Sequence, residues 1–347
     1  MTATAALIVD EAGPATSVQD GGRFGAQRFG LGSAGAMDMA ALAAANALVG
    51  STPRSAAIEI GPFAARFKAN GGCVRIAITG ASRTIKIGER VLAPDSTVVL
   101  ADGETVSVGF AKSGVFSYLS PTGGIQAPPV MGSLAVHQRA GLGSPYARPL
   151  KAGDAIPVLV SPSGGPEHTL LRGPADAGPI RVVLGPQDDY FSADMIAQFL
   201  DTAWRVSAMS DRMGYRLDGP RLSHAKGSNI VSDGIAHGAI QIPGNGLPLV
   251  LLSDRGTTGG YPKIATIVTA DLGRFGQTGV GQAVRFQAVT VEQAQALARV
   301  FAADLATLPG RVVVARDVSV SIERLRDANL AGAAVSATDR STWPEQS

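Results

Sequence analysis

One stretch of the chain combines polar side chains with glycines in a pattern suited to binding and activating a small molecule. It runs from residue 238 to residue 263, between two apolar segments. Glycine lets a ligand approach the backbone closely, and a lysine is a good proton-transfer group because its pKa falls readily on burial. The alternative is a long Gly-rich hairpin, and the spacing does not separate the two. The side chains that could converge are those of Asp254, Thr257, Thr258 and Lys263, over Gly259 and Gly260.

Two shorter segments could also carry chemistry. Gln187 and Asp188 follow an apolar strand and precede a helix, where carboxylate oxygens could hold Mg²⁺ through a nucleotide. The alternative there is helix capping by acidic residues. Arg212 precedes a glycine in the string SDRMGYRL and could fork onto a carboxylate or phosphate. An exposed salt bridge at a turn explains it equally well.

A Gly-rich loop lies near the N-terminus. Gln19, Asp20 and Arg23 begin it, and six of the fifteen residues from 21 to 35 are Gly. Such a loop can present several backbone N–H groups to an anion where it leads into a helix. The pattern by itself favours the simpler interpretation, a surface loop with tight turns.

Standard catalytic signatures are absent from the sequence. There is no P-loop, HExxH, GxSxG or EF-hand motif, and none of the four His pairs with another at metal-ligand spacing. We therefore expect no histidine-bound metal. The single cysteine, Cys73, excludes intrachain disulfides and CxxC chemistry. It lies before an apolar run, so we expect a buried core thiol.

Composition limits the class of protein. The 347 residues suggest two domains, and the net charge of +2 gives no footprint for nucleic acid or an acidic membrane surface. The chain contains 43 Gly, which indicates many tight turns. The N-terminus does not read as a signal peptide and no stretch is long enough for a membrane span, so we expect a cytoplasmic protein.

Most of the chain is predicted to form short strands, which favours barrels or sandwiches over a βαβ fold. Three helices are expected, at about 38–49, 192–200 and 291–308, where Asp38, Ser192 and Thr290 act as N-caps. The predicted strands lie at 74–79, 83–88, 105–110, 115–120, 180–184, 239–242, 248–253, 264–269 and 283–288.

A faint internal repeat suggests that a β domain is duplicated. The strings IEIGP, TGG and GDAI of the first half return in the same order as RLDGP, TGG and GQAV in the second. The Pro/Gly/Ser-rich stretch 161–179 is the natural linker. We predict domains at 1–165 and 166–325, followed by a flexible tail at 326–347.

Several long strings together resemble a known family. VQDGGRFGAQRFGLGSAGAMD, GPQDDYF, SDRMGYRLDGP, GAIQIPGNGLP and DRGTTGGYPKIATIVTADL occur in one order over about four-fifths of the chain. They resemble the KipA/PxpC family, that is, the C subunits of 5-oxoprolinase, also called allophanate hydrolase subunit 2 or the biotin-dependent carboxyltransferase A/B family. The resemblance implies a mainly β fold of two cyclophilin-like β-barrel domains with a few short helices.

The resemblance also implies partners and a reaction. Members work with a KipI/PxpB-like subunit, and a LamB/PxpA-like subunit then completes ATP-dependent hydrolysis of 5-oxo-L-proline to glutamate. The fused homologue in urea carboxylase moves a carboxyl group from carboxybiotin to urea. Four positions depart from the usual strings: Phe24 and Ala26 replace a Pro and a Tyr, Leu134 replaces an Arg, and Gly256 replaces a Gln. The last two matter most here. Both changes remove polar groups, which leaves the identity of the amide substrate open.

Our leading hypothesis is the C subunit of an ATP-dependent 5-oxoprolinase, which requires ATP and Mg at the level of the complex. The alternatives are a biotin-dependent carboxyltransferase half and a non-enzymatic regulator that binds a KipI-like partner. Asp254, Lys263 and Arg212 are the expected catalytic residues, and Gln187 and Asp188 would face nucleotide or metal. The expected substrate-binding residues are Gln241, Thr257, Thr258, Gly259, Gly260, Gln19, Asp20 and Arg23.

Overall fold

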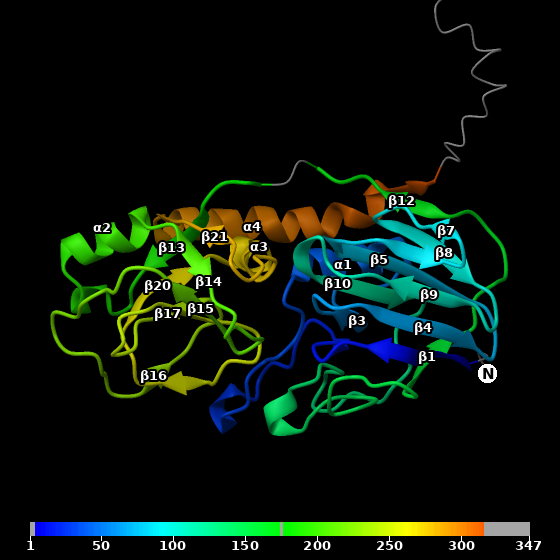
Figure 1. Ribbon diagram of the computed structural model, residues 1–347, viewed down its shortest axis with the longest axis horizontal. Helices are drawn as coiled ribbons and strands as arrows, with labels where there is room; N and C mark the ends of the chain where they lie inside the picture. The colour runs from blue at the N-terminus through cyan, green and yellow to red at the C-terminus, as the bar shows by residue number, and fades with distance from the viewer. Residues whose placement is uncertain (1–3, 174–175, 316–347) are drawn as a thin grey trace, which may run out of the picture. The chain divides into compact units, whose positions relative to one another are not determined.

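The computed structural model describes residues 4–173 and 176–315 (Figure 1). The described residues are mainly β, with a few helices, as the sequence predicted. Those up to residue 314 belong to one compact unit. The predicted boundary near residue 165 stays a prediction, and the predicted tail lies outside the described residues.

Two sheets form the N-terminal half. Their buried apolar side chains share one core, which includes Leu7, Phe67, Ile76 and Ile156. Alternating burial along β4 shows how the strands face this core on one side only. The first sheet has the order β11 (Ala155–Leu159), β1 (Thr4–Ala12), β4 (Ala65–Asn70), β9 (Thr105–Val108), β6 (Ile85–Ile87) and β7 (Arg90–Val91). The second has the order β2 (Ser17–Gln19), β3 (Ala57–Ile60), β10 (Ser113–Pro121), β5 (Val74–Ser82), β8 (Ser96–Leu100), β12 (His168–Leu170) and β23 (Val312–Val314).

The C-terminal half is built on an eight-stranded sheet that curls into a nearly closed barrel. Its order is β21 (Ala283–Val284), β14 (Trp204–Val206), β15 (Gly214–Asp218), β18 (Leu249–Leu251), β17 (Ala239–Gln241), β20 (Lys263–Ile267), β13 (Ile180–Leu184) and β22 (Phe286–Ala288). A separate two-stranded ribbon pairs β16 (Asp233–Gly234) with β19 (Thr258–Gly259).

The predicted single strand at 283–288 is wrong in one respect, because the structure divides it into β21 and β22. Val284 pairs with Trp204 at one edge of the eight-stranded sheet, whereas Phe286 pairs with Ile180 at the other edge. Only Arg285 separates the two strands. This residue therefore marks the place where the two edges approach each other.

The three predicted helices are present, and each begins at its predicted cap. The Asp38 carboxylate accepts from the N–H groups of Ala40 and Ala41, and Thr290 forms a capping box with Gln293. The α-helices are α1 (Met39–Leu48), α2 (Ala193–Asp201), α3 (Leu272–Gly276) and α4 (Val291–Thr307). The 3₁₀ turns are η1 (Gln27–Phe29), η2 (Gln138–Ala140), η3 (Asp188–Tyr190), η4 (Thr269–Asp271) and η5 (Leu308–Arg311).

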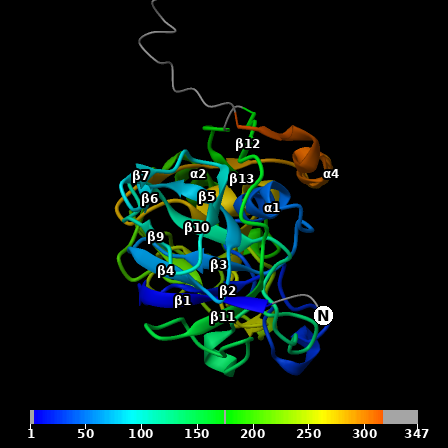
Figure 2. The ribbon, with the colours of Figure 1, turned by 90° about the vertical axis from the view of Figure 1, so that its right-hand side faces the viewer.

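The two halves share structure in two ways. First, α1 packs on β5 and β10 (Figure 2), and its Leu42 belongs to the same core cluster as Trp204 and Phe275. Second, β12 pairs with β8 of the N-terminal half, and β23 then pairs with β12. The helix α4 leads from the last strand of the barrel to β23. The candidate functional site contains side chains from both halves.

Cys73 is not a core thiol as expected. It is partly exposed, because it lies in the bend before β5 and the buried alternation begins only at Val74.

Candidate functional site

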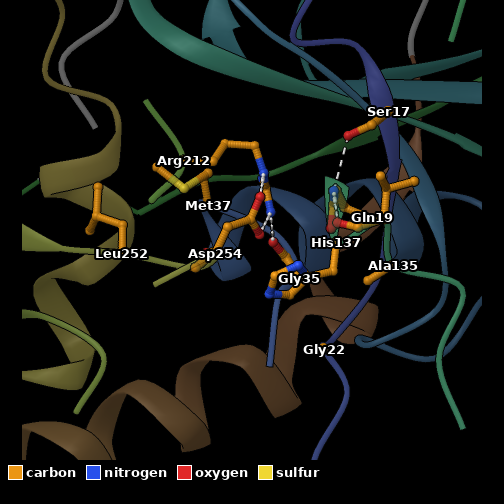
Figure 3. Close-up of polar contacts among 12 residues, drawn as sticks. Ser17, Gln19, Gly22, Gly35, Met37, Ala135, His137, Arg212, Leu252 and Asp254 are labelled. Carbon is orange, nitrogen blue, oxygen red and sulfur yellow. Dashed lines mark hydrogen bonds and ion pairs between the residues drawn. The ribbon is translucent and has the colours of Figure 1, made fainter. Parts of the chain in front are cut away.

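Arg212 is the centre of a polar cluster that joins the two halves. It lies two residues before β15, and Asp254 lies three residues after the end of β18, the antiparallel neighbour of β15. Arg212 Nε lies 3.0 Å from Asp254 Oδ2, and its Nη2 lies 3.0 Å from Oδ1. The same Nη2 donates to the Gly35 carbonyl at 2.7 Å (Figure 3). Its Nη1 forms an ion pair with Glu59 of β3.

Glu59 is fully buried and has several partners. Its Oε2 accepts from the Met37 N–H at 2.9 Å and from the Tyr118 hydroxyl at 2.7 Å. The Tyr118 oxygen in turn accepts from the Asp38 N–H at 2.8 Å, at the start of α1. Burial raises the pKa of Glu59 even though the Arg212 charge lowers it.

The Arg212 guanidinium therefore has carboxylates on two sides and a carbonyl beside them. Burial lowers its pKa, but Asp254 and Glu59 raise it more, so the guanidinium stays charged. Removing one partner of such a buried ion pair strongly destabilises the fold, because the other charge then stays buried without a partner. The structure brings the predicted residues Arg212 and Asp254 together, and each serves as the other's partner. Their catalytic roles stay predictions.

Lys263 belongs to a second cluster. It is 2% exposed, and its Nζ lies 2.8 Å from Oδ2 of Asp233, whose side chain is 53% exposed. This contact lowers the pKa of Asp233. Gln187 joins them: its Oε1 accepts from the Lys263 N–H at 3.1 Å, and its Nε2 lies 3.4 Å from Asp233 Oδ2. The buried Lys263 ammonium is therefore paired with a carboxylate, that of Asp233, which is itself accessible to solvent. Among the described residues, no hydrogen bond or ion pair joins the side chain of Asp188 to this cluster.

The β16–β19 ribbon lies next to the Lys263 cluster. Asp233 of β16 is paired with Gly259 of β19. A Cβ at Gly259 would lie 2.6 Å from the Gln241 amide nitrogen, so a side chain there would require Gln241 to move. The Gln241 amide lies 3.4 Å from the Tyr261 carbonyl. The predicted residues Gln241, Thr258 and Gly259 are therefore neighbours, and the Gly260 carbonyl accepts from the Ile230 N–H at 2.9 Å.

Gln19, Asp20 and Arg23 hold the segment 130–137 rather than facing the two clusters. Asp20 accepts from the Ser133 hydroxyl at 2.8 Å and from the Leu134 N–H at 2.7 Å. Arg23, which is 1% exposed, donates to the carbonyls of Val130, Ser133 and Ala135. The Gln19 amide donates to Ser17 at 3.0 Å and to Val136 at 3.1 Å (Figure 3). The side chain of Leu134 packs against the N-terminal core.

A cavity of about 320 Å³ opens beside both clusters. Of the predicted site residues, Thr257 lines it. Gly234 follows Asp233 of the Lys263 cluster, and Arg255 follows Asp254 of the Arg212 cluster. Each cluster therefore contains a residue that is next in sequence to a residue of the cavity lining. The lining residues are Gln27, Gly32, Gly234, Ile235, Arg255, Gly256 and Thr257.

His237 is a buried histidine whose pKa is affected by the arginines of this region. Burial, together with the charges of Arg255 and Arg212, lowers the pKa of His237 to about 3. The imidazole is therefore neutral at neutral pH. His137 approaches from the N-terminal half, and its Nδ1 accepts from the Ala140 N–H at 3.3 Å (Figure 3).

Sequence reasoning missed Glu59, Asp233 and Arg255. A glutamate inside the apolar strand AIEI was a usable indication, because a buried carboxylate requires a partner. Asp233 and Arg255 carry no local pattern that marks them. Across residues 4–173 and 176–315, no group of three or more His, Cys, Asp or Glu could hold a metal ion. None of the helices in these ranges is long and apolar enough to cross a membrane.

Comparison with known proteins defines the class. The model of the family "carboxyltransferase domain, subdomain A and B" matches residues 29–288, and the chain belongs to this family. The chain is 35% identical to the 5-oxoprolinase C subunit of Escherichia coli over 290 residues, which cover 83% of this chain and 93% of that one. It is 33% identical to the 5-oxoprolinase C subunit of Haemophilus influenzae, with coverage of 84% and 94%.

Solved structures show the same fold within longer proteins. The K. lactis urea amidolyase matches with a TM-score of 0.80 at 28% identity, over 87% of this chain and 20% of that one. The Kluyveromyces lactis urea carboxylase matches with a TM-score of 0.79 at 26% identity, over 91% and 30%. The chain thus spans between a fifth and a third of these larger proteins.

Proposed function

We propose that the chain is the C subunit of an ATP-dependent 5-oxoprolinase. In this proposal it works with a KipI/PxpB-like and a LamB/PxpA-like subunit to activate 5-oxo-L-proline for hydrolysis to L-glutamate. The observation that carries the proposal is the coverage of the relatives: the chain matches 93% of a 5-oxoprolinase C subunit but only 20% of a urea amidolyase.

The clusters beside the cavity support activation of an amide. Attack on an amide places negative charge on its oxygen, and preorganised cationic or N–H donors stabilise that charge. The Lys263 ammonium is buried and held by Asp233 and Gln187, so its position is fixed before substrate binds. In this proposal Lys263 supplies that charge, while Arg212 and Asp254 fix the backbone around Gly35 and Arg255.

In this proposal ATP is a requirement of the complex, and the Gln187 segment of this chain is already engaged in internal contacts. The side chain of Gln187 already contacts the backbone of Lys263 and the carboxylate of Asp233. Asp189, beside Asp188, forms an ion pair with Lys226. This donor set does not fit a magnesium ion.

Co-expression with the two proposed partners tests the function. The purified complex is expected to hydrolyse ATP only when 5-oxo-L-proline is present, and to release glutamate. Lys263→Met should lower this turnover at least ~100-fold, the usual scale for the loss of one donor that stabilises a developing oxyanion. Lys226→Met, which removes an ammonium that is 54% exposed, is the matched control and should stay near wild type. Full activity of Lys263→Met would contradict the assigned role.

A second candidate is the carboxyltransferase half of a biotin-dependent system. The match to a urea carboxylase structure with a TM-score of 0.79 supports it. Biotin would then arrive on another protein. Carboxylation of urea that avidin inhibits would favour this candidate, and tight binding of a KipI-like partner without turnover of any amide would favour a regulator.

A further inference from the structure

The cavity beside Arg255 has the composition of an anion site. Its lining contains one cation, the Arg255 guanidinium, and no acidic residue. Ile235 gives it one apolar wall, and Thr257 and Gln27 contribute neutral polar side chains. A cavity of about 320 Å³ lies at the small end of the size range of ligand pockets.

Arg255 is a buried cation with no carboxylate partner in the described part of the chain. It is 7% exposed, and none of the ion pairs found there includes it. Its Nε donates to the Ile235 carbonyl at 3.2 Å, and its Nη1 lies 3.4 Å from the Leu252 carbonyl. No described atom accepts from Nη2. Burying a charge without a partner is costly, so the site is suited to a ligand that supplies the counter-charge.

Backbone N–H groups add donors to the same lining. The hydrogen bonds of the described residues include none from the N–H groups of Gly256 and Thr257. Successive free N–H groups next to a cation form a typical surrounding for a carboxylate or another small anion. The first Gly-rich loop reaches the same place: a Cβ at Gly32 would lie 2.7 Å from the Arg255 carbonyl.

Gly256 leaves this cavity open. A Cβ at this position would have only the Thr258 carbonyl nearby, at 3.5 Å, so a side chain could be accommodated there. Since Gly256 lines the cavity, such a side chain would take up ligand space. The Gln-to-Gly departure noted in the sequence therefore adds room beside the guanidinium.

We propose that this cavity binds a small organic carboxylate, with Arg255 as its counter-ion, the N–H groups of Gly256 and Thr257 as further donors, and Ile235 against the apolar part. The anion site stands independently of the proposed function. Only the further statement that the carboxylate belongs to the cyclic amide substrate rests on that function. If the carboxylate is that of the substrate, Arg255 makes the site select carboxylic acids over neutral amides.

Calorimetric titration of the purified full chain tests the site with three probes: 5-oxo-L-proline, benzoate and the neutral amide 2-pyrrolidinone. Binding of at least one of the two carboxylates and at least tenfold weaker binding of 2-pyrrolidinone are expected. Arg255→Gln should weaken carboxylate binding about 10- to 100-fold, as loss of a charge-assisted contact does. Arg255→Lys should restore part of it. Binding of 2-pyrrolidinone as tight as the carboxylates, or no binding of either carboxylate, would overturn the proposal.

Gly256→Gln provides a test that leaves Arg255 in place. It should weaken carboxylate binding by narrowing the cavity, whereas Gly164→Gln, at an exposed glycine with nothing within 4 Å of its Cβ position, should bind as wild type. Unchanged binding in both Gly256→Gln and Arg255→Gln would place the ligand elsewhere and refute the site. Benzoate binding that depends on Arg255, without turnover of 5-oxo-L-proline by the complex, would reject the proposed function and keep the anion site.

Discussion

The guanidinium of Arg212 forks onto the carboxylate of Asp254, with Nε 3.0 Å from Oδ2 and Nη2 3.0 Å from Oδ1. Glu59, from the other half of the chain, forms an ion pair with Nη1 of the same guanidinium. The cluster therefore links the two halves through one side chain. Arg255, which follows Asp254 in the chain, lines the cavity.

Removing the Arg212 charge should destabilise the whole fold. Arg212→Gln leaves Glu59 and Asp254 buried without their cation, and breaking such a pair costs about 3–5 kcal/mol. Urea unfolding of the purified chain measures the loss. The control is Arg66→Gln, because the ion pair of Arg66 with Glu11 is exposed and should contribute below about 1 kcal/mol. Equal losses in the two variants would show that the cluster does not stabilise the fold.

Gly35→Ala should separate the effect of close approach from that of backbone strain. Gly35 has φ +91° and its Cβ would lie 2.8 Å from the Gly22 Cα, whereas Gly30 has φ +81° and nothing within 4 Å. Both variants pay the cost of alanine at positive φ, about 1–2 kcal/mol. Gly35→Ala should lose a further 1–3 kcal/mol or so through overpacking. Thermal unfolding compares them, and a loss no greater than in Gly30→Ala would contradict the packing described.

Acidification should destabilise the protein through His237. Its folded pKa is lowered from 6.5 to about 3, so this contribution to stability is complete above pH 6.5 and is lost as the pH falls toward 3. The slope from one proton is at most about 1.4 kcal/mol per pH unit. His237→Gln should flatten the profile of unfolding free energy between pH 6.5 and 4.5, while His168→Gln should follow wild type. A profile of His237→Gln that parallels wild type would show that another group binds the proton.

Asp20→Ala should release the segment that follows Met131. The Asp20 carboxylate accepts from Gly22, Ser133 and Leu134, so its removal leaves donors in a largely buried region without partners, at about 1–3 kcal/mol for each buried group. Hydrogen exchange of peptides covering residues 130–137 should accelerate at least tenfold. Asp102→Ala, which removes an exposed acceptor for the Gly71 N–H, should not change exchange there.

Local features of the chain could be predicted from sequence, and contacts between distant residues could not. The helices that start after Asp38, Ser192 and Thr290 follow from capping patterns within a few residues, and each is found where expected. The Gly-rich loop was favoured as a surface turn, yet Gly35 accepts from Arg212 across 177 positions. No periodicity encodes such a pairing.

The candidate site shows the same limit. The string DRGTTGGYPK marked Asp254 and Lys263 correctly as polar residues in one region, but the structure places them in separate clusters. Arg212, the partner of Asp254, and Asp233, the partner of Lys263, come from other parts of the chain, and only the fold brings them near. Arg255 escaped notice because its significance lies in lacking a carboxylate, a property that a sequence does not display.

The attachment of β12 and β23 to the N-terminal sheet has a consequence for biosynthesis. The ribosome completes β8 early, and β12 (residues 168–170) covers its edge soon afterwards, but β12 receives its own outer neighbour only from residues 312–314. During translation the outer edge of β12 stays unpaired while the entire barrel is still being made, and an open edge invites pairing with other chains. The nascent protein therefore depends on a late segment to close an early sheet, so premature termination before residue 312 would yield aggregation-prone fragments rather than a stable first half.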